Sequence, residues 1–464
     1  MVRGVVTAVV FGWNLLWSWV VLVQWGLIPS DAAARSLLAA QVWFSRDPKL
    51  VNLGFVWLPL PGLLGLPLTA IPGLWQRGLA QAAVSAMSGA RAPQLVGSGA
   101  GAGGWGRARA HRVAAFALHP VTVFLSATGL SEMVFFAAAL AQLRCLVGWW
   151  DAVGQGSRRV ALEWLVGLGL AAAAGGLTRY EGWVLAGFVV LLVTLRLWQK
   201  GLGPDHWQAS LVVVGAAPLY AALFWVFSNW LILGDPWYFA RGPYAAAAEA
   251  AAAAGTVTGW PSVVAIVLAG WQLWPPFWAA WIATFLVGIA RRDGRLLALS
   301  AFWSVLVGFY ALALGVGPVA FLQYRYLGFI VPAGLTLVAA VLGAGRARPT
   351  IQALAGLGLV VTGPLVGLGG MLADPAPIGN SMRPVAETVL GRPVGLWAAE
   401  RAMADYLRTT RGPFLPTATV GSNLCCSGVG TLVASSSPRT AISRRRCVRL
   451  GGGLPTSWCR IRRG

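Results

Sequence analysis

The chain alternates between long apolar stretches and short segments that carry its charges. Stretches of about 18 to 25 apolar residues recur, and each is long enough as a helix to cross roughly 30 Å of hydrocarbon. Lone strands cannot satisfy their backbone in lipid, so the pattern predicts helices. The first stretch, Val5 to Ile28, is too long for the apolar region of a signal peptide and lacks a small-residue cleavage site. It therefore predicts a first membrane span.

The pattern predicts about eleven transmembrane helices. One crossing falls between Leu53 and Leu95, formed either by the proline-rich piece Gly54 to Leu74 or by Leu79 to Val96. The other nine are predicted at Val113 to Gly129, Met133 to Trp150, Val160 to Leu177, Gly182 to Trp198, Ala209 to Leu233, Trp271 to Ala290, Leu296 to Val316, Leu327 to Leu342 and Ile351 to Met371.

Composition agrees with an all-α polytopic membrane protein. Of the 464 residues, 57% are hydrophobic and 11% charged, and the mean hydropathy is +0.69. The net charge of +21 comes from arginines in short loops, which is typical of cytoplasmic loops rather than of nucleic-acid binding. With these loops inside, the N-terminus is predicted to be cytoplasmic and the C-terminus extracytoplasmic. The basic clusters are Arg107, Arg109, His111 and Arg112; Arg158 and Arg159; Arg196 and Lys200; Arg291, Arg292 and Arg295; and Arg346 and Arg348.

Six of the fourteen carboxylates fall at or beside the ends of apolar stretches, all on the predicted outer face. A carboxylate near hydrocarbon is costly and rarely kept without a role, so the set predicts a wet, charged cavity on that face. The six are Asp31, Asp47, Glu132, Glu181, Asp235 and Glu249.

The chain changes character after the last span. Residues 1–371 are predicted to form the transmembrane module, and residues 372–420 a small extracytoplasmic segment that includes an amphipathic helix from Glu400 to Arg411. Residues 421–464 carry four of the five cysteines and no acidic residue. They lack the paired spacing of a zinc site, and the preferred hypothesis is a tail encoded out of frame.

Asp31 opens the outer loop after the first span. A carboxylate at this water–membrane boundary could act as general base for an acceptor hydroxyl. The alternative is a residue that caps the helix beginning after Ser30, and spacing alone leaves the two open. A second charged group, Arg46, Asp47 and Lys49, follows in the same loop.

The order of these segments resembles the GT-C glycosyltransferases, multi-spanning enzymes that take sugar from polyprenyl-phosphate carriers. The first span, the Asp-bearing loop, RDPKL and GFVWLPLPGLL resemble the opening of these enzymes. HPVTVFLSATGLSE (His119 to Glu132) is similar to a motif of the GPI mannosyltransferase 2 branch, with His119 where that branch has asparagine. TRYEGW (Thr178 to Trp183) and QYRYLGFIVPA (Gln323 to Ala333) resemble arginine-bearing outer helix ends of bacterial and archaeal members. The likeness covers roughly residues 1–415.

The resemblance implies roles for individual residues. Asp31 would be the catalytic base, with Asp47 as a second candidate. Arg179 and Arg325 would face the carrier phosphate, which fits the bidentate, permanently charged guanidinium. Glu181 would orient Arg179 or contact sugar hydroxyls. The remaining candidates for substrate binding are Arg46, Lys49, Glu132 and Tyr326.

Structural explanations compete with these roles. Arg179 and Glu181 fit charges that reach to the membrane interface. Arg325, between two tyrosines, fits an aromatic belt with a capping cation. Glu132 at the start of a span fits a helix N-terminal acid favoured by the dipole, and His119 before a proline fits a packed, hydrogen-bonded residue.

The function implied is inverting transfer of a hexose, mannose if the resembled branch is followed, to an extracytoplasmic glycan, lipid or protein. The alternatives are a transporter or flippase of a lipid-linked glycan, and an inactive GT-C homologue. No cofactor is assigned with certainty. Asp31 and Asp47 would share a divalent ion, or two arginines would neutralise the phosphate without one.

Overall fold

The computed structural model describes residues 2–55, 57–96, 107–242, 260–316, 323–344, 347–400, 402, 446–448 and 458–460. Up to residue 242 the helices are α1 (Val2–Ser18), η1 (Trp19–Gln24), α2 (Ser30–Phe44), η2 (Leu50–Leu53), α3 (Leu60–Thr69), α4 (Pro72–Trp75), α5 (Leu79–Val96), α6 (Arg107–Leu118), α7 (Pro120–Ala127), α8 (Glu132–Gly154), α9 (Arg158–Gly176), α10 (Glu181–Gln199), α11 (Pro204–Leu233) and α12 (Tyr238–Arg241). The later elements are α14 (Trp260–Leu273), α15 (Pro276–Ala290), α16 (Gly294–Val316), η3 (Tyr324–Phe329), α17 (Ile330–Ala344), α18 (Pro349–Leu372), α19 (Arg383–Val389), β1 (Arg446–Val448) and β2 (Trp458–Arg460).

The prediction of an all-α polytopic membrane protein is confirmed for the part of the chain that the structure describes. Eight of its helical segments are long and apolar enough to span a membrane, and the bent pair α14–α15 makes a ninth. The two further predicted crossings correspond to α5 and to the broken helix α6–α7. Of the two options for the second crossing, Leu79 to Val96 forms one continuous helix, whereas Gly54 to Leu74 is divided among short elements.

Two predicted spans are interrupted by proline. The stretch from Trp271 to Ala290 is not one helix, because α14 and α15 meet at 107° around Pro275 and Pro276. The stretch from Val113 to Gly129 breaks before Pro120, where α6 ends and α7 begins. Proline lacks the backbone N–H and disfavours helical backbone in the residue before it, so both breaks follow from the sequence.

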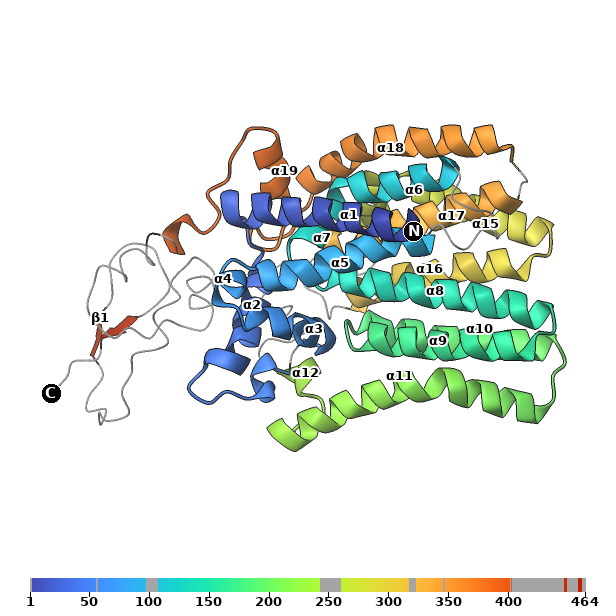
Figure 1. The fold of residues 1–464 in the computed structure, drawn as a ribbon, viewed down its shortest axis with the longest axis horizontal. Coiled ribbons are helices and arrows are strands. Elements are labelled where there is room, and N and C mark those ends of the chain that lie inside the picture. The colour runs from blue at the N-terminus through green and yellow to red at the C-terminus, as the bar shows by residue number, and fades with distance from the viewer. Residues whose placement is uncertain are drawn as a thin grey trace.

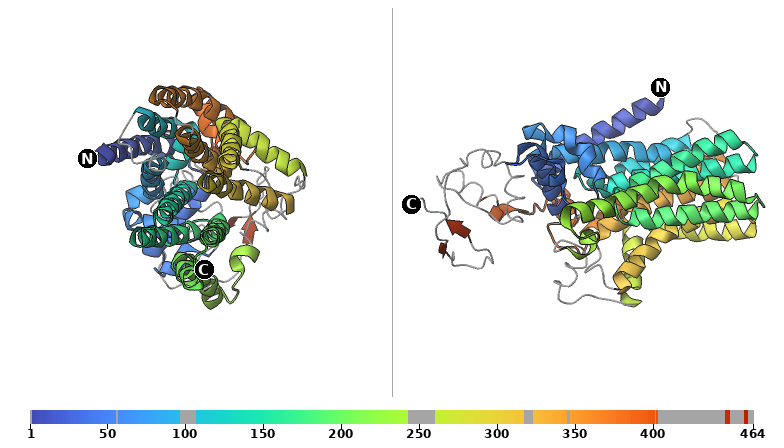
Figure 2. Two further views of the ribbon diagram at one scale, coloured as in Figure 1. Left: turned by 90° about the vertical axis from the view of Figure 1, so that its right-hand side faces the viewer. Right: turned by 90° about the horizontal axis from the view of Figure 1, so that it is seen from below.

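The long helices form a bundle with a distinct group of elements at one end (Figure 1). There α2, α3, α12 and α19 gather beside the turns that join α7 to α8 and α9 to α10. At the opposite end lie the turns that join α8 to α9, α10 to α11 and α15 to α16. Figure 2 shows the same bundle end-on and from below. We call the first end the site end.

The two ends of the bundle carry different charged residues. Arg158, Arg196 and Arg291 lie at the end opposite the site end, as the loop pattern predicts. Asp31, Glu132 and Glu181 begin helices at the site end. These three carboxylates therefore lie on one side of the bundle, whereas Glu249 lies outside the described residues.

Buried side chains from nearly all the long helices share one hydrophobic core. Within it α8 is the most buried of the candidate spans, whereas α11 and α18 have the smallest buried shares. Close helix packing depends on small residues at a few contacts. A Cβ atom on Gly182 would lie 2.3 Å from the carbonyl oxygen of Gly175, so the tight turn from α9 to α10 requires glycine there.

Little of the chain beyond residue 402 is described. The predicted amphipathic helix from Glu400 to Arg411 lies outside the described residues apart from positions 400 and 402. In the basic tail, β1 and β2 form an antiparallel pair in which Cys447 and Cys459 are opposite each other, although the sequence showed no strand periodicity there. The rest of that tail lies outside the described residues.

Candidate active site at one end of the helix bundle

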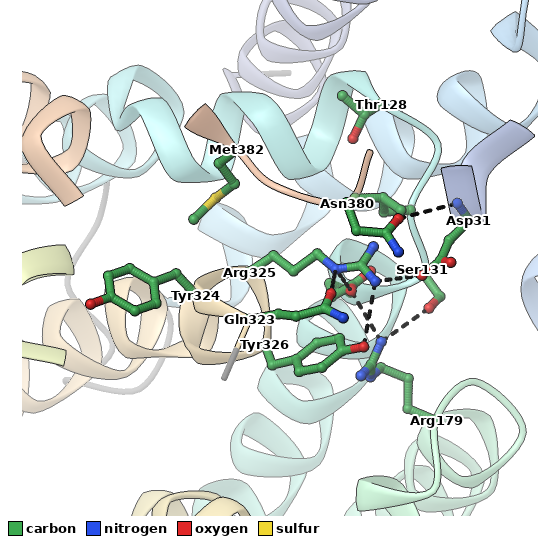
Figure 3. Close-up of polar contacts among 12 residues, drawn as sticks. Asp31, Thr128, Ser131, Arg179, Gln323, Tyr324, Arg325, Tyr326, Asn380 and Met382 are labelled. Carbon is green, nitrogen blue, oxygen red and sulfur yellow. Dashed lines mark hydrogen bonds and ion pairs between the residues drawn. The ribbon is translucent and has the colours of Figure 1, made fainter. Parts of the chain in front are cut away.

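Five separate parts of the chain meet at the site end. The start of α2 brings Asp31 and Arg35, and the start of α8 brings Glu132. The turn from α9 to α10 brings Arg179 and Glu181. The short helix η3 brings Arg325 and Tyr326, and the segment after α18 brings Asn380 (Figure 3).

Asp31 and Arg325 form the centre of this group. The Arg325 Nη2 atom donates a short hydrogen bond to Asp31 Oδ2, and its Nε atom donates to Gln323 Oε1 at 2.6 Å. The Arg325 side chain is only 1% exposed, whereas that of Asp31 is 26% exposed. The guanidinium is thus inside the protein, while the carboxylate keeps a route to the surface.

Glu132 connects the two arginines that the sequence singled out. Its Oε1 atom lies 3.2 Å from Arg179 Nη1 and 3.5 Å from Arg325 Nε. The Glu132 side chain is almost fully buried. A buried charge is stable only when it is paired, so Glu132 and both arginines depend on one another.

Glu181 holds Arg179 from the other side. Its Oε1 atom accepts hydrogen bonds from Arg179 Nη2 at 2.8 Å and Nε at 3.1 Å, and from the Tyr310 hydroxyl. Glu181 was expected either to orient Arg179 or to contact sugar hydroxyls. These hydrogen bonds are the ones that orient Arg179. The Ser131 hydroxyl also lies 3.4 Å from Arg179 Nη1.

Tyr326 supplies an aromatic wall to both guanidinium groups. The Cζ atoms of Arg179 and Arg325 lie 4.8 Å and 5.1 Å from its ring centroid, which is within cation–π range. The Tyr310 ring stacks on Tyr326 at 6.0 Å with an interplanar angle of 7°. The two rings thus form one aromatic side of the charged group.

Arg35 is a member of this group that the sequence did not single out. It lies one helical turn after Asp31 on α2, its Cζ atom is 5.2 Å from the Trp57 ring centroid, and its Nη1 atom is buried without a hydrogen-bond partner. Burial lowers the pKa of Arg35, and the charges of Glu132 and Asp31 oppose that shift. The i, i+4 spacing from Asp31 was the available signal, because such residues share one face of a helix.

The arginines control the protonation of Asp31. Burial raises the pKa of its carboxyl, but the positive charges of Arg325, Arg35 and Arg179 outweigh that effect and hold the pKa below its usual value. The carboxylate is therefore ionised and weakly basic while it is paired with Arg325. The residue at the N-cap position of α2 is Pro29, and Asp31 lies in the first turn of the helix with its carboxylate bonded to Arg325.

The structure places the second predicted charged group elsewhere. Arg46, Asp47 and Lys49 are exposed after the end of α2, where Lys49 Nζ pairs with Asp47 Oδ2 at 2.5 Å. The 15 residues of α2 separate Asp47 from Asp31 by about 20 Å. At this separation one divalent ion could not bind both carboxylates, because its ligands lie within about 2.6 Å of it. No group of three or more His, Cys, Asp or Glu side chains is arranged to hold a metal ion in the described ranges.

The two arginines are also more buried than the structural explanations from the sequence would require. A side chain that reaches to the membrane interface is exposed at its charged end, but Arg325 and Arg179 are 1% and 14% exposed. Their charges are directed into the protein. Asp235, by contrast, stabilises a turn after α11, where its Oδ1 atom accepts from the backbone N–H of Trp237 at 2.9 Å. His119 is fully buried against Trp274.

Comparisons with known proteins find similarity only at the level of solved structures. No family model and no curated protein matches the chain. The structure is similar to that of ArnT from Cupriavidus metallidurans in the apo state, with 16% identity over 91% of this chain and 76% of that one, at a TM-score of 0.47. It is also similar to the apo oligosaccharyltransferase of Archaeoglobus fulgidus, with 13% identity over 87% of this chain and 58% of that one, at a TM-score of 0.44.

A third solved structure is the archaeal oligosaccharyltransferase AglB from Archaeoglobus fulgidus, in complex with an inhibitory peptide and a dolichol-phosphate. It shares 13% identity over 87% of this chain and 58% of its own length, at a TM-score of 0.42. The chain thus spans little more than half of the archaeal proteins. These similarities concern the arrangement of the helices alone. The fold and the site together define the class: a multi-pass membrane protein with a buried arginine–carboxylate group at one end of its bundle.

Proposed function

We propose that the protein is a GT-C type membrane glycosyltransferase that moves a hexose from a polyprenyl-phosphate carrier to an extracytoplasmic acceptor. Mannose is the sugar that the resembled branch indicates. The observation that carries the proposal is the meeting of Asp31 with three guanidinium groups, those of Arg35, Arg179 and Arg325, at one end of the spans. This arrangement provides a base and a phosphate site next to each other.

Two donor atoms in the group are available to a phosphate. The Nη1 atoms of Arg35 and Arg325 are both buried and have no hydrogen-bond partner. The other guanidinium, that of Arg179, is already held by Glu132 and Glu181. A phosphate oxygen would satisfy the free N–H groups with charge-assisted hydrogen bonds, which are among the strongest in proteins. Arg35 and Arg325 are therefore the proposed contacts of the carrier phosphate.

Phosphate binding would also activate the base. Once a phosphate shares the charge of Arg325, that guanidinium attracts Asp31 less, and the pKa of the Asp31 carboxyl rises toward its usual value. The carboxylate becomes more basic at the time when the donor is in place. In the empty site, the same ion pair keeps two buried charges compensated.

The proposed reaction is a single displacement with inversion. The acceptor hydroxyl gives its proton to Asp31 as its oxygen forms a bond to the anomeric carbon. The bond from that carbon to the phosphate oxygen breaks, and the electron pair leaves with the polyprenyl phosphate. Arg35 and Arg325 stabilise the additional negative charge on the leaving group, an electrostatic effect that often makes the largest contribution to catalysis.

Substitution of Arg325 tests this proposal. Arg325→Ala removes the guanidinium that contacts both the phosphate and Asp31, so sugar transfer should fall by at least about 100-fold. Arg383→Ala is the matched control, because Arg383 lies at the same end of the bundle and, within the described part of the chain, forms an ion pair only with Glu387 of α19. Transfer is measured in membranes that contain equal amounts of each variant. Wild-type activity of Arg325→Ala would refute the proposed phosphate site.

A further inference from the structure

Outside the candidate active site, one buried carboxylate accepts hydrogen bonds from four donors. Asp374 follows α18 and is 4% exposed. Its Oδ1 atom accepts from the backbone N–H groups of Tyr324 at 3.3 Å and Ala376 at 3.2 Å. Its Oδ2 atom accepts from the backbone N–H of Met382 at 2.8 Å and from the Ser381 hydroxyl at 3.1 Å. Asp374 thus folds residues 374–382 into a closed loop and ties that loop to η3.

The same loop holds the beginning of α2. Asn380 Oδ1 accepts from the Ser30 hydroxyl at 2.5 Å and from the backbone N–H of Asp31 at 3.4 Å. The backbone N–H of Ser30 donates to the carbonyl oxygen of Gly379 at 2.9 Å. Pro29, the residue before α2, has no side-chain cap, so these contacts from a distant part of the chain take the place of a local cap.

Trp397 makes a further hydrogen bond near the start of α2. Its Nε1 atom donates to the carbonyl oxygen of Ile28 at 2.8 Å, just before α2. Its φ of 62° lies in the left-handed region, which is unfavourable for a bulky residue and persists only where the surroundings impose it. A Cβ atom on Gly379 would lie 3.1 Å from the Trp397 ring, so the ring packs closely on this glycine.

The two residues that meet in the site are therefore both attached to one loop. Asp31 and Arg325 are 294 positions apart, and their ion pair is the direct contact between them. Asp374 binds the residue before Arg325, and Asn380 binds Asp31 itself. A shift of the loop would change the separation of the two charges.

We propose that residues 374–382 form a positioning loop, in which Asp374 and Asn380 hold η3 and the start of α2 in the one register that brings Asp31 to Arg325. This inference rests on the proposed transferase function, in which Asp31 is the base. Asp374 and Asn380 are positioning residues, because neither is placed to touch the reacting atoms.

The experiment compares Asn380→Ala with Glu387→Gln in the full-length protein, with polyprenyl-phosphate mannose as donor. Glu387 follows the loop on α19 and, among the residues that the structure describes, forms an ion pair only with Arg383, so its substitution controls for changes in this region. Misplacement of Asp31 should lower the kcat of Asn380→Ala by about 10- to 100-fold, while the KM for the donor stays within about twofold. Glu387→Gln should match the wild type.

The pH profile separates positioning from general destabilisation. The groups that face Asp31 are Arg325, Arg35 and Arg179, whose positive charges lower its pKa, and Glu132 and Tyr326, which border the same guanidiniums. When Asn380→Ala loosens the ion pair, the pKa of Asp31 should rise, and the acid limb of kcat should move to higher pH. A loss of folded protein alone would lower the activity without moving that limb.

Ser30→Ala provides a second line of evidence. Its hydroxyl donates to the same Asn380 oxygen, so the losses in kcat from Ser30→Ala and Asn380→Ala should not add in the double variant. Spontaneous disulfide formation by the pair Ser30→Cys and Asn380→Cys checks the docking without a transfer assay.

The outcomes distinguish this proposal from the function on which it rests. An active Asp31→Asn variant would refute the proposed base. An inactive Asp31→Asn beside an Asn380→Ala variant with wild-type kcat and an unmoved acid limb would refute only the positioning loop. Absence of the disulfide in the Ser30→Cys, Asn380→Cys protein would also overturn it.

Discussion

At the scale of single residues, the site is a set of opposite charges that compensate one another inside the protein. Three guanidinium groups and three carboxylates meet there, and Glu132 contacts two of the arginines. Such a set is costly to assemble, because each ion loses its hydration. A site that binds and releases a phosphate gives a reason for that cost, since two of the guanidinium N–H groups are free to receive it.

The environment of Arg35 leads to a prediction about donor binding. Its Nη1 atom has no partner, and no described carboxylate lies within ion-pair distance of it. Arg35→Gln should therefore weaken donor binding and raise the KM for the donor about 10-fold, with a smaller loss of stability than a broken ion pair would cause. Initial rates over a range of donor concentrations measure the KM. An unchanged KM would remove Arg35 from the phosphate site.

The sequence predicted part of this group and missed part of it. Asp31, Glu132, Arg179, Glu181, Arg325 and Tyr326 were singled out as candidates, and the structure brings all six together. Asn380 was missed because its contact with Asp31 spans 349 positions, and no local pattern reports such a pairing. Asp47 was included because it shares a loop with Asp31, but the length of α2 carries it away.

At the scale of elements, the turn between α9 and α10 positions two of the charges. Thr178 Oγ1 donates to the carbonyl oxygen of Ala174 at 2.7 Å, and the backbone N–H of Arg179 donates to that of Gly175 at 3.1 Å. The turn is tight because Gly182 packs directly on the end of α9. Arg179 and Glu181 are thereby held on one side of the turn, facing Glu132.

Two glycines of α10 allow a matched test of this turn. A Cβ atom on Gly182 would lie 2.3 Å from a backbone oxygen, whereas one on Gly187 would have no atom within 4 Å. Gly182→Ala should therefore displace Arg179 and abolish most of the transfer, and Gly187→Ala should keep it. Thermal unfolding in detergent and transfer assays on both variants provide the measurement. Equal behaviour of the two would show that the turn does not position the site.

A proline in an apolar stretch did not by itself decide whether the helix breaks, because α11 and α18 continue through Pro218 and Pro364. The apolar pattern identifies the spans, because hydrocarbon thickness sets their length. It does not report that α14 and α15 meet at 107°, since both halves are equally apolar and the bend depends on Pro275 and Pro276. Polar positions such as Gln81 and Arg91 in α5 made the second crossing ambiguous, although the helix is continuous and packs in the bundle.

At the scale of the whole molecule, the two ends of the bundle differ in charge. Arginines from the loops α8–α9, α10–α11 and α15–α16 gather at one end, and the carboxylates of the site lie at the other. The excess of positive charge on cytoplasmic loops orients membrane proteins. We therefore propose that the site end faces away from the cytoplasm.

Cysteine labelling tests this orientation. In a background without the five native cysteines, Asp47→Cys at the site end should react with a membrane-impermeant maleimide in intact cells. Leu202→Cys, in the exposed turn between α10 and α11, should react only after permeabilisation. The reverse pattern would place the site in the cytoplasm and contradict the proposed acceptor.

The central claim is that Asp31 removes a proton from the acceptor during transfer from a lipid-linked donor. It is tested most directly by the transfer of radiolabelled mannose from polyprenyl-phosphate mannose in membranes with the wild type or with Asp31→Asn, at equal amounts of inserted protein. The account predicts transfer by the wild type and a loss of at least about 100-fold in the variant, since general bases contribute about 10²- to 10⁴-fold. Equal transfer by the two proteins, or none by the wild type, would contradict it.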